Sequence, residues 1–235
     1  MKLVIFDCDG TLVDSQNAIL ASMEQAFAFL GLPAPTRGEM LGVVGLSLPQ
    51  AFAALVPDAD EAARAAWVDR YRSQYRHTAA TPMNEQAPLY PGIAEAIATL
   101  GGRDDILLGI ATGKSRRGVA RVLEREGWHG RFLTIQTADD HPSKPHPSMI
   151  LQAMVEAGVE PEATVMIGDT TFDIEMALAA RVGAIGVGWG YHAAERLTLA
   201  GAHTLAATRA SLIETIDAQL AAQAACLAGR EKRSA

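Results

Sequence analysis

Two carboxylates one residue apart end the first apolar run of the sequence, Ile-Phe-Asp-Cys-Asp-Gly-Thr at residues 5–11. Because alternate side chains of an extended chain point to opposite sides, Asp7 and Asp9 should face one way and Cys8 the other, into the core. Gly10 permits a tight turn and Thr11 can hydrogen-bond within it, which would hold both carboxylates toward one point. Such a pair can bind a divalent cation, although a turn or a helix cap would use the same residues. The calcium loop of an EF-hand fits poorly, since it needs a further acidic residue before its glycine and a helix on each side.

Further candidate residues lie at or after later apolar runs. Thr112 and Gly113 belong to "ATGKS", where a hydroxyl, a bare backbone and the start of a helix suit an anion. "IGDTTFD" places Asp169 at a strand tip and Asp173 four residues later, and Lys144 lies in "SKPHP", where the following proline disfavours helix. Each residue alone has an ordinary explanation as a cap, a surface charge or a helix-dipole partner. Because ligands bind beyond the carboxyl ends of parallel strands, their shared position at successive strand ends indicates one site.

The elements that would position these residues alternate between short apolar runs and segments of helical periodicity. Predicted strands cover residues 2–6, 106–111, 131–136, 164–168 and 184–188. Predicted helices cover residues 92–102, 115–127, 147–158, 171–183 and about 208–227. Near-continuous apolar strands separated by helices predict an α/β fold, a doubly wound parallel sheet covered on both faces.

Residues 15–86 interrupt this alternation, because they carry helix signals and no convincing strand. Thr36 and Glu39 could form a capping box, and long stretches on both sides of them have apolar residues at helical spacing. We therefore predict a catalytic core made of residues 1–14 and 87–235, and an all-helical cap domain inserted after the first strand.

Composition limits the function. The 235 residues carry a formal net charge of −7, from 27 acidic and 20 basic residues, and contain no long basic tract. This argues against nucleic acid and favours a small-molecule partner. Cys8 and Cys226 cannot form a disulfide framework, and no apolar run approaches the roughly 20 residues of a membrane helix. We expect a cytoplasmic protein without membrane contact, either a monomer or a homodimer.

Together, "DCDGTLVDS", "ATGKS", "SKPHP" and "IGDTTFD" resemble the motifs of the haloacid dehalogenase superfamily. Over nearly the whole chain, the order of elements is similar to that of its phosphoglycolate-phosphatase-like members, which carry a helical cap after the first motif. One residue departs from the pattern. Gly113 stands where many relatives have asparagine, so we expect only a backbone contact to phosphate there.

The resemblance implies a magnesium-dependent phosphatase that hydrolyses a small phosphomonoester, either phosphoglycolate-like or a sugar phosphate. Asp7 would attack phosphorus to form an aspartyl phosphate, and Asp9 would act as general acid and then as general base. Thr112, the Gly113 backbone and Lys144 would hold the phosphoryl oxygens.

The resemblance also implies metal ligands, namely Asp7, Asp169 and the carbonyl of Asp9. Asp173 would support the site, through a water or as a partner of Lys144. Each pair of like charges roughly 4 Å apart costs on the order of 4 kcal/mol at an effective dielectric constant of about 20, which one lysine cannot offset. A hard cation with oxygen ligands can, and Mg²⁺ suits carboxylates together with a substrate phosphate.

A β-phosphoglucomutase-like sugar phosphomutase is the main alternative, because it would share the aspartates and differ in how the cap binds a second phosphate. The cap stretch at residues 41–52 has no basic side chain, which favours a hydrolase. Arg37, Arg72 or Arg76 could still reach an anionic leaving group.

Other interpretations carry less weight. Dehalogenation is disfavoured by Asp9, phosphonate cleavage by the lack of lysine in the predicted cap, and a binding protein would have no need for so costly a cluster of charges. Lys114 and Arg116 are interpreted as solvated charges in the first turn of a helix. Residues 186–192 could line the pocket floor or pack within their loop. Hinges between cap and core are expected near residues 13–16 and 80–88.

Overall fold

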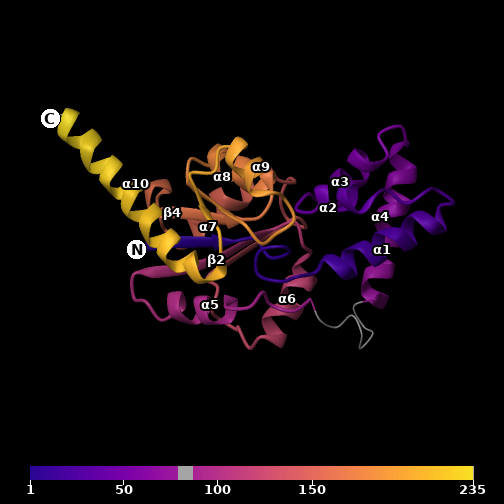
Figure 1. Ribbon diagram of the computed structural model, residues 1–235, viewed down its shortest axis with the longest axis horizontal. Coiled ribbons are helices and arrows are strands. Elements are labelled where there is room, and N and C mark those ends of the chain that lie inside the picture. Colours follow the sequence, from indigo (N-terminus) through magenta and orange to yellow (C-terminus); the bar gives the residue numbers. More distant parts are fainter. Residues whose placement is uncertain (79–86, 235) are drawn as a thin grey trace.

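The computed structural model describes residues 1–78 and 87–234, which form a six-stranded parallel sheet with helices around it (Figure 1). The strands are β1 (Lys2–Phe6), β2 (Ile106–Thr112), β3 (Thr134–Thr137), β4 (Thr164–Gly168), β5 (Gly183–Val187) and β6 (Thr204–Ala206). Their order across the sheet is β3-β2-β1-β4-β5-β6, so the chain builds outward from β1 and then continues from β4 on the other side. This confirms the predicted doubly wound α/β sheet. Its topological switch point lies between β1 and β4, where such sheets bind ligands.

Helices cover both faces of the sheet. One face packs against α5 (Ile93–Gly101), α6 (Arg116–Arg125) and α10 (Leu212–Ser234), and the other against α7 (Ser148–Ala157), α8 (Thr171–Ala179) and α9 (Ala194–Leu199). The 3-10 turns are η1 (Pro161–Ala163) and η2 (Arg209–Ser211). Along β1, Val4 and Phe6 join the first layer while Leu3 and Ile5 join the second, as expected for a strand buried on both sides. Within the described residues, no helix combines the length and apolar character needed to cross a membrane.

Four helices between β1 and α5 form what we call the cap segment. They are α1 (Gln16–Phe29), α2 (Arg37–Gly42), α3 (Leu48–Leu55) and α4 (Glu61–Thr78), and they lie together beyond one end of the sheet (Figure 1). Phe52 centres a hydrophobic cluster of their own, with its ring 6.2 Å from those of Trp67 and Tyr71. Over residues 16–78, the predicted helical character and the Thr36–Glu39 capping box are confirmed. The exact domain division stays a prediction, and most of the second predicted hinge lies outside the described residues.

The sheet differs from the prediction at its edges. β3 begins at Thr134 rather than at residue 131, because the preceding residues form a turn in which Phe132 packs on Trp128, with ring centroids 5.8 Å apart. The prediction missed β6, which has three residues, only one of them fully buried. An edge strand this short has no long apolar run, and its pairing with β5 is a tertiary contact.

Candidate active site

Asp7 directly follows β1 and lies buried against a buried lysine. Lys144 Nζ lies 2.9 Å from Asp7 Oδ1 and 2.5 Å from Asp173 Oδ1, and at most 1% of each side chain is exposed. Burial raises the pKa of Asp7 to about 6, although Lys144 acts in the opposite direction. Burial lowers the pKa of Lys144, but the two carboxylates outweigh this effect and bring the pKa above its usual value. Lys144 is therefore a cation fixed between two carboxylates, and Asp173 is its partner.

Asp169 occupies the equivalent position after β4, and a sharp turn makes room for it. Its Oδ1 accepts a hydrogen bond from Thr11 Oγ1 at 3.0 Å, and its Oδ2 accepts one from the Tyr191 backbone N–H at 2.8 Å. A Cβ atom on Gly10, which has a φ of 86°, would lie 2.2 Å from Asp169 Oδ2. Burial raises the pKa of Asp169 well above its usual value, and the charges of Asp173 and Asp7 raise it further. The switch point between β1 and β4 thus holds two buried carboxylates.

These carboxylates fit a divalent cation. One oxygen each of Asp7, Asp169 and Asp173 lies within 4.8 Å of the others. The buried Oδ1 of Asp7 accepts no hydrogen bond of regular geometry among the described residues, even with the Lys144 ammonium nearby. Three buried carboxylates and one lysine also leave an excess of negative charge. Oxygen donors, excess negative charge and an unpaired oxygen are the features that a hard cation such as Mg²⁺ satisfies.

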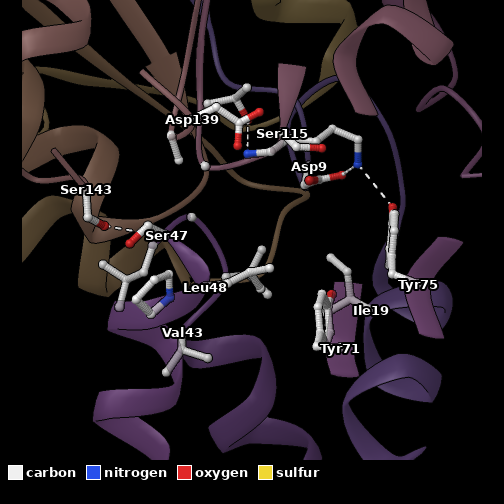
Figure 2. Close-up of a pocket in the computed structure, with 18 of the residues that line it drawn as sticks. Asp9, Ile19, Val43, Ser47, Leu48, Tyr71, Tyr75, Ser115, Asp139 and Ser143 are labelled. Atoms are coloured by element: carbon white, nitrogen blue, oxygen red, sulfur yellow. Dashed lines mark hydrogen bonds and ion pairs between the residues drawn. The ribbon is translucent and has the colours of Figure 1, made fainter. Parts of the chain in front are cut away.

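Asp9 has a different set of partners. Its Oδ1 accepts hydrogen bonds from Ser15 Oγ at 2.6 Å and from Lys114 Nζ at 2.7 Å. The same ammonium donates to the Tyr75 hydroxyl of α4 at 3.2 Å (Figure 2). Burial lowers the pKa of Lys114, but the Asp9 carboxylate outweighs this and the pKa lies well above its usual value. The interpretation of Lys114 as a solvated charge is therefore wrong, because the side chain folds back to Asp9 and only 8% of it is exposed. Arg116, on the exposed face of α6, fits that interpretation.

The residues after β2 form a second wall of the site. Thr112 is buried, and its Oγ1 accepts a hydrogen bond from the Lys114 backbone N–H at 3.2 Å. A Cβ atom on Gly113 would lie 2.5 Å from the carbonyl oxygen of Gly45 and 2.9 Å from that of Leu46. Gly113 therefore lies where the backbone of the cap segment closely approaches the core.

The stretch that approaches Gly113 is the cap loop, residues 43–49, which leads from α2 into the first turn of α3. The Ser47 backbone N–H donates to Ser143 Oγ at 2.8 Å (Figure 2). Just before the cap loop, the carbonyl oxygen of Gly42 lies 3.3 Å from Nε2 of His192. The cap loop is thus fixed against loops that follow β2, β3 and β5.

A cavity of about 540 Å³ lies between the cap segment and the carboxyl edge of the sheet (Figure 2). The predicted site residues that line it are Asp7, Asp9, Thr112 and Gly113. Those clustered behind Asp7 are Lys144, Asp169 and Asp173. All residues proposed for the site are therefore near this cavity or directly behind its floor.

Sequence reasoning did not link Asp9 to two groups that order it, Ser15 and Tyr191. Ser15 donates to its carboxylate, and the Tyr191 hydroxyl lies 3.2 Å from the Ser15 backbone nitrogen and 3.0 Å from its Oγ. Ser15 closes the motif "DCDGTLVDS", which could have drawn attention to it, whereas no local pattern links Tyr191 to Asp9 across the chain. In the same stretch, Trp189 Nε1 donates to the Thr11 carbonyl at 3.2 Å, so residues 186–192 support the site by loop packing.

The three arginines considered for an anionic leaving group separate in the structure. Arg72 of α4 lines the cavity. Arg37 instead hydrogen-bonds to Gln16, at the start of α1. The side chain of Arg76 lies outside the described residues.

Comparison with known proteins agrees with this geometry. The family model of haloacid dehalogenase-like hydrolases matches residues 4–187. The chain is 36% identical over 224 residues to the probable phosphatase IndB of Dickeya dadantii, covering 93% of this chain and 94% of the relative. It is 32% identical over 194 residues to a phosphoglycolate phosphatase of Agrobacterium fabrum, covering 80% and 81%. A solved structure described as a predicted phosphatase from Clostridium acetobutylicum has a TM-score of 0.81 and 27% identity, covering 92% of this chain and 97% of that one. The chain belongs to the haloacid dehalogenase-like hydrolases.

Proposed function

We propose that this protein is a magnesium-dependent phosphatase that hydrolyses a small phosphomonoester through an aspartyl-phosphate intermediate. The observation that carries the proposal is a buried aspartate on the floor of a cavity, with Lys144 Nζ 2.9 Å from Asp7 Oδ1. A second aspartate, Asp9, lines the same cavity. The relatives named phosphatase and phosphoglycolate phosphatase support the same reaction class.

Asp7 is the proposed nucleophile. Its carboxylate attacks phosphorus, the bond from phosphorus to the leaving oxygen breaks, and Asp9 gives that oxygen a proton. Asp9 then takes a proton from the water that attacks the aspartyl phosphate, which releases phosphate and restores Asp7. Ser15 and Lys114 both hold Asp9 Oδ1, so Oδ2 is the oxygen available for these transfers.

The remaining residues hold the transferred group. The Thr112 hydroxyl, the Gly113 backbone and the Lys144 ammonium would bind phosphoryl oxygens, with Asp173 keeping Lys144 in place. Asp7, Asp169 and the carbonyl of Asp9 would hold Mg²⁺, which supplies positive charge against the negative charge of the phosphoryl group.

A sugar phosphomutase remains the second candidate, because it would use the same aspartates. It would also need a site in the cap segment for a second phosphate. The cap loop contributes no basic side chain to the cavity, and Arg72 is the described arginine that the cap segment supplies there. This lining supports the hydrolase over the mutase.

The test is phosphate release from a panel of phosphomonoesters, with Mg²⁺ and with excess chelator, by the natural protein and Asp7→Asn. We expect release that requires Mg²⁺ and falls at least about a thousandfold in the variant, because the nucleophile is lost while the shape is kept. Asp105→Asn, a change at a surface ion pair with Lys2, is the matched control and should retain activity. Conversion of glucose 1-phosphate to glucose 6-phosphate without phosphate release would instead identify a mutase.

A further inference from the structure

The cap loop forms a largely aliphatic part of the cavity wall, in which Ser47 is the one polar side chain. Cap-loop residues that line it are Val43, Val44, Gly45, Leu46, Ser47, Leu48 and Pro49, and the helices behind add Ile19, Met23 and Tyr71. Figure 2 shows Leu48, Ile19 and Tyr71 of the cap segment across the cavity from Asp9, with Val43 farther away on the same side. The leaving group of a phosphoester held at Asp7 would share the cavity with this part of the wall.

Packing inside the cap segment does not account for all of these side chains. Leu48, Ile19 and Tyr71 are packed within the cap segment or buried at its base. In contrast, Val43, Val44 and Leu46 are half-buried and belong to none of the hydrophobic clusters of the described residues. Three aliphatic side chains in one short loop are therefore presented to the cavity rather than to a core.

Charged groups at the cavity do not alter the character of this wall. Lys114 is already paired with Asp9 at 2.7 Å. Three arginines also line the cavity, Arg72 from α4 and Arg117 and Arg121 from α6. Asp139 and His141 line it from the segment after β3, so none of these charged or titratable groups belongs to the cap loop. Sugar hydroxyl groups placed against Val43, Val44 and Leu46 would lose hydrogen bonds to water without gaining side-chain partners there, whereas apolar groups would gain from leaving water.

We propose, on the basis of the phosphatase function proposed above, that the natural substrate has a leaving group with an apolar body, about the size of a ring or a branched alkyl chain. Val43, Val44 and Leu46 are its specificity residues. The cavity volume of about 540 Å³ supports a body of this size, since pockets of roughly 300–1,000 Å³ enclose drug-sized ligands. A two-carbon acid such as glycolate would leave most of that space to water.

The experiment compares two esters of matched shape, cyclohexylmethyl phosphate and glucose 6-phosphate. Each carries its phosphate on a primary carbon attached to a six-membered ring, so the main difference is the set of ring hydroxyls. We expect kcat/KM to be about tenfold or more higher for cyclohexylmethyl phosphate, because binding in an apolar pocket discriminates by roughly that factor.

Two isosteric variants test the wall itself. Val43→Thr and Val44→Thr keep the side-chain shape and add a hydroxyl, and each should reduce the preference for the cyclohexyl ester about three- to tenfold. Val155→Thr makes the same change at a position of α7 that is 76% exposed, and it should leave the preference unchanged. Circular dichroism and thermal melting of each variant confirm that it is folded.

The outcomes separate the two proposals. If kcat/KM for glucose 6-phosphate equals or exceeds that for cyclohexylmethyl phosphate, the apolar leaving group is overturned and the phosphatase function is not. The same conclusion follows if the threonine variants keep the preference of the natural protein. Absence of phosphate release from every ester tested would overturn the phosphatase and this inference with it. A preference for the cyclohexyl ester that the cap-loop variants reduce, and the control does not, would support both.

Discussion

At the scale of single residues, the site concentrates negative charge that the fold alone does not neutralise. Asp7, Asp169 and Asp173 are buried together, and Lys144 is the cation placed among them. Burial raises the pKa of Asp7 to about 6 and that of Asp169 well above its usual value, so ionisation of either carboxyl weakens the metal-free fold. A bound cation would reverse this effect.

The pH dependence of stability tests this account. The pKa of Asp7 is about 6 in the folded chain, higher than its usual value of 3.8, so the folded state binds the proton more tightly. The stabilisation that protonated Asp7 gives the folded state is fully present below pH 3.8 and is lost as pH rises through about 6. The loss in the free energy of unfolding is on the order of 3 kcal/mol. In excess chelator, the free energy of unfolding measured with urea should therefore fall between pH 4 and pH 7 for the natural protein relative to Asp7→Asn.

The second part of that experiment repeats the unfolding measurements in the presence of Mg²⁺. Saturating Mg²⁺ should raise the unfolding free energy of the natural protein at pH 7 far more than at pH 4, because only the ionised carboxylates bind it well. Asp7→Asn should respond less. Identical pH profiles for the two proteins in chelator would contradict the assignment of the raised pKa to Asp7.

At the scale of elements, the site depends on loops at the carboxyl ends of β1, β2 and β4 and on the cap loop that covers them. One close approach is between Gly113 and the backbone of Gly45 and Leu46, whose carbonyl oxygens would lie 2.5 and 2.9 Å from a Cβ atom on Gly113. A backbone carbonyl cannot move aside as a flexible side chain can, so a side chain at Gly113 would have to displace the cap loop. Gly113 is thus a positioning residue for closure over the cavity.

Gly113→Ala should therefore lower kcat/KM, by about tenfold or more, with a smaller effect on stability. The physical reason is that a Cβ atom 2.5 Å from the Gly45 carbonyl oxygen prevents the cap loop from reaching its docked position. Phosphate-release kinetics and thermal melting measure the two effects. Gly38→Ala is the matched control, because a Cβ atom there, on α2 of the same cap segment, meets no atom within 4 Å. Full activity in Gly113→Ala would show that docking tolerates the displacement.

At the scale of the whole molecule, the described residues form three separate hydrophobic clusters. The sheet and its two helix layers form two clusters, and the cap segment forms a third. Polar contacts such as those at Ser47–Ser143 and Lys114–Tyr75 join the cap segment to the core. We propose that the cap segment opens to admit substrate and closes to exclude bulk water during transfer.

A reversible cross-link tests opening. Ser47→Cys with Ser143→Cys, in a Cys226→Ser background that leaves only the buried Cys8, places two thiols at the contact between cap loop and core. Joining them with a short cleavable reagent should reduce turnover of cyclohexylmethyl phosphate at least about tenfold, because the ester cannot enter a closed cavity. Cleavage of the cross-link in the same sample should restore turnover. Unchanged turnover in the cross-linked protein would argue against opening as part of the cycle.

The sequence by itself determined the parallel α/β sheet, the helical insertion and the residues placed at the strand ends. Apolar runs that continue through a strand require cover on both faces, and parallel strands bring their carboxyl ends to one edge, so Asp7, Thr112 and Asp169 had to meet. Local patterns also sufficed for the capping box of α2 and the burial of Cys8.

Only the tertiary structure decided which charges are neutralised and what faces the substrate. Lys114 resembles any first-turn lysine in sequence, yet the fold buries it against Asp9, and Tyr191 reaches Ser15 from a loop 176 residues away. The short β6 and the closeness of the cap loop to Gly113 also depend on contacts between distant segments. Periodicity reports whether a side chain turns inward, but the identity of its partner depends on how separate elements pack, and that arrangement turned Val43 and Val44 toward the cavity.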